Sequence, residues 1–181
     1  HAIKQWELTD FDATEAMLRE KLHYPMFIKP ANAGSSVGVS KATNKESLRK
    51  GLETALQVDS KAIVEECIIG QEVETAVLGN QDPKAALVGE IVPKVEFYDY
   101  DAKYKDDSTD LYIPARISDE TAGRIKAIAL KAYKVLGCMG MTRVDFFIQK
   151  DGTIVLNEPN TIPGFTSISM YPKLWIAAGL P

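Results

Sequence analysis

Cysteine and histidine are scarce in this sequence, which has two of each among 181 residues. Cys67 and Cys138 lie far apart and form no CxxC pair, so we expect neither a disulfide framework nor a cysteine metal site. Long hydrophobic runs are also missing. None approaches the ~20 residues that cross a membrane, and the N-terminus lacks the apolar core of a signal peptide. These absences together predict a protein of the reducing cytoplasm.

Positive charge is in short supply as well. The sequence has 21 Lys and Arg against 25 Asp and Glu, which gives a net charge of −4. A protein that binds nucleic acid by neutralising phosphates needs a basic face, so we expect no nucleic-acid partner and no membrane partner. The phosphate-binding patterns GxxxxGK[ST] and GxGxxG are absent too.

What is present is an alternation of strand-like and helix-like segments. Hydrophobic patterning predicts strands at 24–30, 37–42, 61–68, 71–79, 85–93, 140–149 and 153–160. Helices are predicted at 9–21, at 44–56 with a capping box formed by Thr43 and Glu46, and from Ser118 to Leu136. Residues 96–113 are predicted mostly as loop. This order, with at least one hairpin, is typical of an α+β fold.

The segment KPANAGSSVGVSK, residues 29–41, is rich in glycine and serine. Glycine allows the backbone to approach a ligand, and successive N–H groups can bind an anion. Yet the segment leads into a strand, so no helix N-terminus is aimed at a phosphate. A structural hairpin tip is the simpler interpretation from these residues alone, and phosphate binding is the alternative.

A second hairpin, near the C-terminus, gathers polar side chains. The sequence KDGT at 150–153 predicts a two-residue type I′ turn, which places Asp145 opposite Glu158 and Arg143 opposite Asn160 on one face. Two carboxylates ~5 Å apart repel by about 3 kcal/mol at an effective dielectric constant of ~20. A divalent cation would relieve this repulsion, and oxygen ligands suit Mg²⁺ or Mn²⁺. The alternative is a solvated sheet face on which Arg143 offsets the charge.

Five segments, in this order and spread over nearly the whole chain, resemble the D-alanine–D-alanine ligases of the ATP-grasp superfamily. They read FIKPANAGSSVGVSK, VEECIIGQEVETAVLGN, FYDYDAKY, TRVDFF and LNEPNTIPGFTSIS. The resemblance implies two α+β subdomains with antiparallel-rich sheets that sandwich ATP. The small subdomain would span 1–72 and carry a glycine-serine lid, and the large one would span 73–181 and carry the metal site.

The resemblance also implies roles for individual residues. Those expected at the nucleotide are Lys29, Ser35, Ser36, Glu65, Glu66, Ile68, Glu72, Phe97, Lys103 and Phe147. Those expected to hold two Mg²⁺ (or Mn²⁺) ions are Asp145, Glu158 and Asn160. The expected catalytic residues are Arg143 and Gly164 at the oxyanion, Lys103 at the γ-phosphate, and Tyr104 bonded to Ser35. Arg143, Gly164 and Ser169 are expected at the amino-acid substrates.

The implied activity is ATP-dependent joining of two D-alanines through an acyl phosphate, for peptidoglycan precursors of the cell wall. Members of the family are longer and begin with another domain, so we expect this chain to be an incomplete portion that cannot complete a turnover alone. A homodimer of the complete enzyme is a family expectation. Two alternatives stay open. One is a D-alanine–D-lactate or D-serine ligase, against which YDYDAKY argues, and the other is a non-catalytic module that binds ATP and Mg²⁺.

Overall fold

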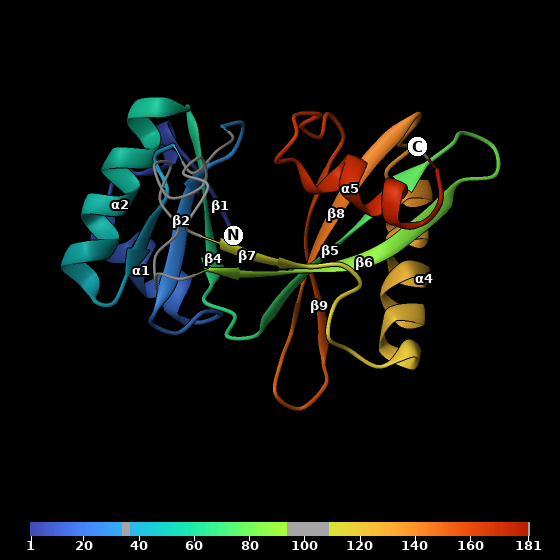
Figure 1. Ribbon diagram of the computed structural model, residues 1–181. Coiled ribbons are helices and arrows are strands. Elements are labelled where there is room, and N and C mark those ends of the chain that lie inside the picture. The colour runs from blue at the N-terminus through green and yellow to red at the C-terminus, as the bar shows by residue number, and fades with distance from the viewer. Residues whose placement is uncertain (34–36, 94–108, 181) are drawn as a thin grey trace. The chain divides into compact units, whose positions relative to one another are not determined.

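The computed structural model describes residues 1–33, 37–93 and 109–180. These residues form two compact units, separated along the chain between Ile68 and Ile69, and Figure 1 labels most of their helices and strands. Each unit combines helices with an antiparallel sheet, so the expected α+β class is confirmed. The division expected after Glu72 falls inside strand β5 (Gln71–Leu78), which belongs to the second unit.

The first unit is a four-stranded sheet with two α-helices. In chain order its elements are β1 (Ala2–Lys4), the 3₁₀ turn η1 (Gln5–Glu7), α1 (Phe11–Arg19), β2 (Met26–Pro30), β3 (Ser40–Ala42), α2 (Lys45–Val58) and β4 (Lys61–Glu66). The strand order is β1-β4-β2-β3, and every pair is antiparallel.

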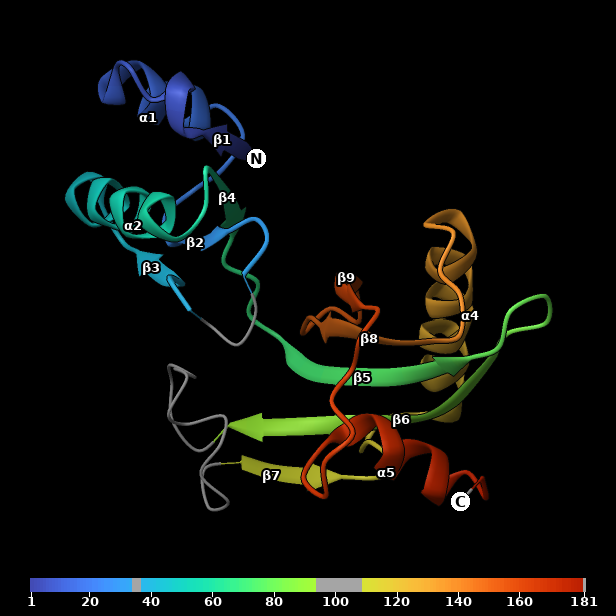
Figure 2. The same cartoon turned by 90° about the horizontal axis from the view of Figure 1, so that it is seen from above.

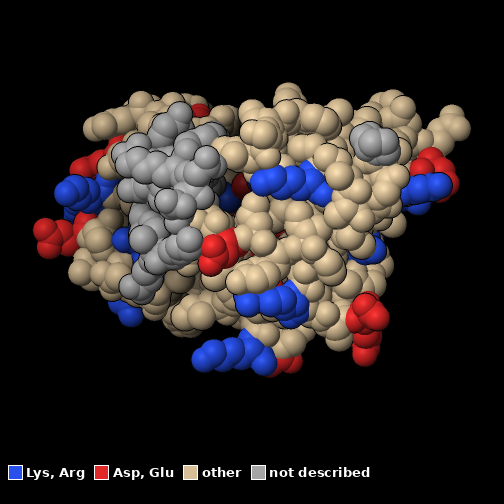
Figure 3. Space-filling model, in the orientation of Figure 1, with Lys and Arg blue, Asp and Glu red and all other residues tan. Residues whose placement is uncertain are grey.

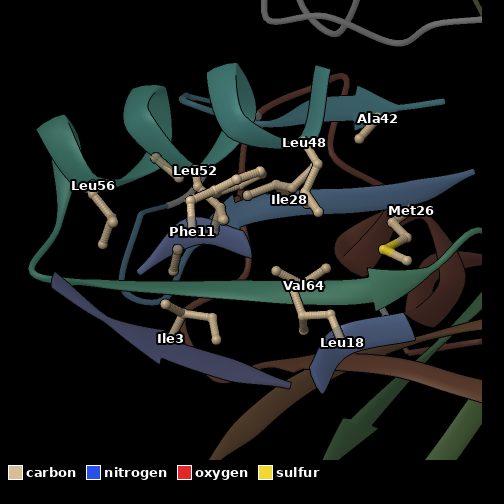
Figure 4. Close-up of a cluster of buried hydrophobic side chains, with 12 residues drawn as sticks. Ile3, Phe11, Leu18, Met26, Ile28, Ala42, Leu48, Leu52, Leu56 and Val64 are labelled. Carbon is tan, nitrogen blue, oxygen red and sulfur yellow. The ribbon is translucent and has the colours of Figure 1, made fainter. Parts of the chain in front are cut away.

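Burial alternates along β2 and so shows which face of this sheet the helices cover. Met26 and Ile28 are buried, while Phe27 and Lys29 on the opposite face are only partly buried. Helix α2 places Leu48 among the core side chains that meet Ile28, as Figure 4 shows. The period of two in β2 therefore directs Lys29 to the face that the helices leave uncovered.

Both helices of the first unit begin later than the sequence predicts, α1 by two residues and α2 by one. Helix α1 is capped by Asp10, whose carboxylate accepts hydrogen bonds from the amides of Asp12 and Ala13. Helix α2 is capped by Asn44, whose Oδ1 accepts from the Ser47 amide at 2.9 Å. The predicted capping box of Thr43 and Glu46 is therefore wrong. The side chain of Asn44 caps the helix instead, by accepting from the backbone amide of the third helical residue, Ser47.

The second unit is a five-stranded sheet with a helix on each face. It contains β5, β6 (Lys84–Pro93), β7 (Thr109–Tyr112), α4 (Asp119–Val135), β8 (Met141–Ile148), β9 (Ile154–Asn160) and α5 (Met170–Ala177). The order is β7-β6-β5-β8-β9. Ser118 caps α4 as expected and accepts from the Thr121 amide. Strand β7 was expected to be loop.

The two helices of the second unit pack on opposite faces of its sheet (Figure 2). Helix α4 covers the face that carries Val73, Val144 and Phe146. Helix α5 covers the other face, where Gly89 makes room for it: a β-carbon there would lie 2.9 Å from Cδ2 of Leu174. Polar residues that alternate with the α4-facing core therefore share a face with α5.

The face drawn in Figure 3 shows no continuous basic surface, and no membrane-spanning helix is seen in the described residues. On the face drawn in Figure 3, basic side chains are separated by acidic and uncharged ones. In the described ranges, no helix combines the length and the apolar character needed to cross a bilayer.

Candidate active site

The hairpin that joins β8 to β9 has a three-residue loop. The Gln149 amide donates to the carbonyl of Thr153, and the Gly152 amide donates to the carbonyl of Gln149, both at 2.9 Å. Gly152 has a φ of +83°, in the left-handed region that this type of loop places at its last position. The predicted two-residue type I′ turn is therefore wrong by one residue.

A bulge in β9 compensates for the longer loop. Next to the loop Phe146 pairs with Leu156, but beyond the irregularity Asp145 pairs with Glu158, so Asn157 is the extra residue. The predicted opposition of Asp145 and Glu158, and that of Arg143 and Asn160, is therefore confirmed. Strand β9 is at the edge of its sheet, a position that suits Pro159, which has no backbone N–H to donate.

A third carboxylate extends this pair into a row across three strands. Glu74 of β5 lies directly opposite Asp145 of β8, which in turn lies opposite Glu158 of β9. Directly opposed residues point to the same face of a sheet, here the face covered by α5. The side chain of Glu74 is buried, with 2% of the residue exposed.

Arg143 is the cation within this row. Its Nε lies 2.7 Å from Oδ1 of Asp145, and its Nη2 lies 2.7 Å from Oδ2, so the pair is bidentate. The same Nε lies 3.2 Å from Oε2 of Glu74. Burial lowers the pKa of Arg143, but the hydrogen bonds and charge of Asp145, with the charges of Glu74 and Glu158, outweigh burial and raise it above its usual value. Arg143 therefore stays protonated.

The donor set of the row suits a hard cation. Its acidic members, Glu74, Asp145 and Glu158, offer oxygens only, and among the described side chains they outnumber the one guanidinium, that of Arg143. Asn160 adds an amide oxygen, which accepts from the Ile162 amide at 3.3 Å. In the part of the chain that the structure describes, no three His, Cys, Asp or Glu side chains gather closely enough to hold a metal ion. The magnesium site stays a prediction.

Gly164 and Ser169, the residues expected at the substrates, lie close together before α5. A β-carbon on Gly164 would lie 2.7 Å from Oγ of Ser169. That Oγ accepts from the Thr166 amide at 3.0 Å and lies 2.9 Å from the Thr166 hydroxyl. The small side chain at 164 thus leaves room for a hydroxyl held in one orientation.

Residues expected at the nucleotide are found in both units. In the second unit, Glu72 lies opposite Phe147 on the same sheet face as Asp145. In the first unit, Lys29 and Glu65 share the less covered face of their sheet, with Nζ 2.9 Å from Oε2.

Glu66 and Ile68 lie at the end of the first unit. Glu66 is the last residue of β4, and Ile68 follows two residues later. The remaining predicted site residues fall outside the described ranges: Ser35, Ser36, Phe97, Lys103 and Tyr104. Their roles stay predictions.

Glu74 is the one member of the row that the sequence analysis did not single out. Its signal was present in the segment EVETAV, where an acidic residue recurs at a period of two in an otherwise apolar strand. Such a residue is exposed or, if buried, paired with a cation. Only the register of β5 with β8 distinguishes these cases.

Residues 3–181 match the family model described as D-ala D-ala ligase C-terminus. The chain belongs to this family. The D-alanine--D-alanine ligase of Clostridium acetobutylicum is 58% identical over 163 residues, which are 90% of this chain and 48% of that protein. That of Bacillus velezensis is 50% identical over 177 residues, 98% of this chain and 50% of that protein.

Solved structures of ligases agree with this family membership. The VanG D-Ala:D-Ser ligase of Enterococcus faecalis has a TM-score of 0.86 and 43% identity, and the match covers 98% of this chain and 51% of that one. The D-alanine-D-alanine ligase of Coxiella burnetii has a TM-score of 0.84 and 35% identity, and covers 100% and 47%. The expected ATP-grasp fold is confirmed. The chain spans about half the length of the D-alanine--D-alanine ligases that it matches.

Proposed function

We propose that this chain is the ATP-binding and metal-binding portion of a cytoplasmic D-alanine–D-alanine ligase, which makes dipeptide for peptidoglycan precursors. The observation that carries the proposal is the pairing of Asp145 with Glu158 beside Arg143 on the sheet face that α5 covers. The names of its relatives, D-alanine--D-alanine ligase, support the choice of D-alanine as the substrate.

In the proposed reaction, the carboxylate of the first D-alanine attacks the γ-phosphorus of ATP and gives an acyl phosphate and ADP. The amine of a second D-alanine then attacks the acyl carbon, phosphate leaves, and the amine loses a proton. No nucleophile of the protein is required. The protein has to neutralise charge, orient both substrates and exclude water.

The residues of this chain divide these tasks. Lys29, at a half-buried position beside Glu65, would contact the phosphates. Arg143 would donate to the developing oxyanion, with the backbone of Gly164 as a second donor. The hydroxyl of Ser169 would bind the carboxylate of the second substrate.

Asp145, Glu158 and Asn160 would hold Mg²⁺, and a bound divalent cation would neutralise phosphate charge and polarise the phosphoryl oxygens. The chemistry of these three oxygen donors fits that ion. The nucleotide would also meet Glu65, Glu66, Ile68, Glu72 and Phe147. The proposed roles of Ser35, Ser36, Phe97, Lys103 and Tyr104 rest on the resemblance.

A second candidate function is ligation of D-alanine to D-serine. The likeness to VanG, a D-Ala:D-Ser ligase, favours it at 43% identity. A competition assay with labelled D-alanine and D-serine separates the candidates. We expect D-alanyl-D-alanine as the main product, and an excess of D-alanyl-D-serine would reverse the assignment.

The proposal is tested by joining the chain to the part of the Clostridium acetobutylicum ligase that it does not span. We expect phosphate release and dipeptide from the joined protein with ATP, Mg²⁺ and D-alanine. The chain alone should bind ATP without forming dipeptide. An Asp145→Asn version of the joined protein should lose turnover. Binding of ATP by a folded joined protein that never forms dipeptide would favour a non-catalytic module.

A further inference from the structure

The buried carboxylate of Glu74 takes no part in the reaction proposed above, yet it touches the guanidinium on which the site depends. Glu74 is 2% exposed, and its Oε2 lies 3.2 Å from Nε of Arg143. Burying a carboxylate is unfavourable unless a cation compensates it. The contact with Arg143 helps to compensate this cost, and it joins Glu74 to the candidate active site.

Arg143 and a metal ion would compete for the same atoms. Nε and Nη2 of Arg143 take both carboxylate oxygens of Asp145, at 2.7 Å each. A cation at Asp145 and Glu158 would share at least one of these oxygens, and its charge would repel the guanidinium. A donor of Arg143 that is pushed away from Asp145 requires another acceptor.

The sheet provides that acceptor without any change in the backbone. Glu74 lies opposite Asp145 in the row, so it reaches the same Nε from the neighbouring strand. Nε of Arg143 already lies within 3.2 Å of Oε2 of Glu74, so a small movement of the Arg143 side chain is enough to change its partner.

We propose that Glu74 is a positioning residue that accepts Nε of Arg143 when a divalent cation takes an oxygen of Asp145. Glu74 thereby keeps the guanidinium at the site while Asp145 is released to the cation. This inference rests on the metal role that the proposed function gives to Asp145.

The first test is Mn²⁺ binding to the 181-residue chain, followed by electron paramagnetic resonance of the free ion. Glu74→Gln keeps the shape of the side chain and replaces a charged acceptor by a neutral one. Charge-assisted hydrogen bonds are roughly twice as strong as neutral ones, so we expect the Kd for Mn²⁺ to rise about tenfold. An unchanged or lower Kd would overturn the proposal.

Glu90→Gln is the matched control. Glu90 is 4% exposed and is paired with an arginine, Arg116, but it lies opposite Val73 and so on the other face of the sheet. The same chemical change there should leave the Kd for Mn²⁺ as in the wild type. An equal rise in both variants would assign the effect to a general loss of structure and refute the role of Glu74.

A double-mutant cycle separates positioning from simple attraction between Glu74 and the cation. In an Arg143→Met background Glu74 has no guanidinium to hold, so Glu74→Gln should no longer weaken Mn²⁺ binding. A tenfold weakening that persists in this background would show that Glu74 acts through its own charge, contrary to the proposal.

A measurement on the wild type covers the case in which Glu74→Gln does not fold. The ¹⁵N–¹H signal of Arg143 Nε should shift on addition of Mg²⁺ and should stay slow to exchange, because Glu74 accepts the proton. A signal that is unaffected at saturation, or that is lost to exchange with water, would refute the partner change.

The outcomes also separate this inference from the proposed function. Mn²⁺ binding that depends on Asp145 but not on Glu74 would refute only the role of Glu74. Binding that is insensitive to Asp145→Asn would remove the metal site from the proposed function, and the role of Glu74 would fall with it.

Discussion

Gly164 and Ser169 are so close that a single methyl group on Gly164 would lie 2.7 Å from Oγ of Ser169. The hydroxyl is held there by Thr166, through its amide and its side chain. Two residues expected to bind the amino-acid substrates are thus coupled sterically.

Gly164→Ala should therefore turn the Ser169 hydroxyl away from Thr166. The free energy of unfolding should fall by about 0.5–1.5 kcal/mol, the value of one ordinary hydrogen bond. Chemical denaturation and the amide signal of Thr166 measure this. Gly123→Ala is the control, because nothing lies within 4 Å of its β-carbon position and it sits in helix α4. It should stabilise the chain by about 0.5–1 kcal/mol; a loss of stability equal to that of Gly164→Ala would contradict the coupling.

Gly38 should be more sensitive to substitution than the other glycines with positive φ. It has a φ of +73°, and its β-carbon would lie 2.9 Å from Cγ of Pro30 and 3.1 Å from Cγ2 of Val58. We expect Gly38→Ala to lower the free energy of unfolding by about 2–4 kcal/mol, from backbone strain and overpacking together. Gly137→Ala, at a φ of +66° in open space, should lose only about 1 kcal/mol. Equal losses in urea denaturation would show that packing at Gly38 is irrelevant.

Arg143→Met should make the chain depend on divalent cations. Removal of the guanidinium leaves Asp145 without the cation that holds both of its oxygens, so the free energy of unfolding should fall by about 3–5 kcal/mol. Mg²⁺ should then raise the Tm of the variant more than that of the wild type, because it binds the folded state preferentially. Arg116→Met, which breaks an arginine pair on the other face, should show no added response to Mg²⁺ in calorimetry. Equal Tm shifts in both variants would argue against cation binding at this row.

Glu90 should contribute to acid sensitivity. Hydrogen bonds from Arg116 lower the pKa of the Glu90 carboxyl in the folded state, although burial opposes this. Charged Glu90 therefore stabilises the fold above its unfolded pKa of about 4.3, and this contribution disappears as the pH falls through the lower, folded pKa. Glu90→Gln should be less stable at pH 7 by about 1–3 kcal/mol and should lose less stability on acidification. Parallel stability–pH curves for the two proteins would rule this out.

Substitutions at the start of α2 should show that Asn44 caps this helix and that the predicted capping box of Thr43 and Glu46 does not form. Asn44→Ala should lower the free energy of unfolding by about 1 kcal/mol, because its Oδ1 caps the Ser47 amide. Glu46→Ala, which removes the other member of the predicted capping box, should change stability by less than about 0.5 kcal/mol. Thermal denaturation measures both. The reverse order of effects would restore the predicted capping box.

Much of the fold was readable from local patterns. The alternation in 140–149 and 153–160 predicted a hairpin with Asp145 opposite Glu158, and β8 and β9 have that pairing. The length of the loop was not predictable, because the Asp-Gly pair suits both two-residue and three-residue loops. The pairing survived because the bulge at Asn157 offsets the extra loop residue.

Helix α5 was not anticipated, for a different reason. Its sequence, MYPKLWIA, contains a proline and no clear polar face. Pro172 lies in the first turn, where its missing N–H breaks no hydrogen bond within the helix. The apolar surface of α5 has a place to pack because Gly89 leaves one on the sheet.

The sequence by itself determined the elements that a period of two or a cap defines, the family resemblance, and the face shared by Arg143, Asp145 and Glu158. These depend on neighbours along the chain or across one short hairpin. Only the tertiary structure decided that β5 lies beside β8, a pairing between distant segments. That pairing buries Glu74 opposite Asp145 and brings its carboxylate to Arg143. A buried carboxylate and an exposed one look alike in a sequence, because burial is a property of what packs around them.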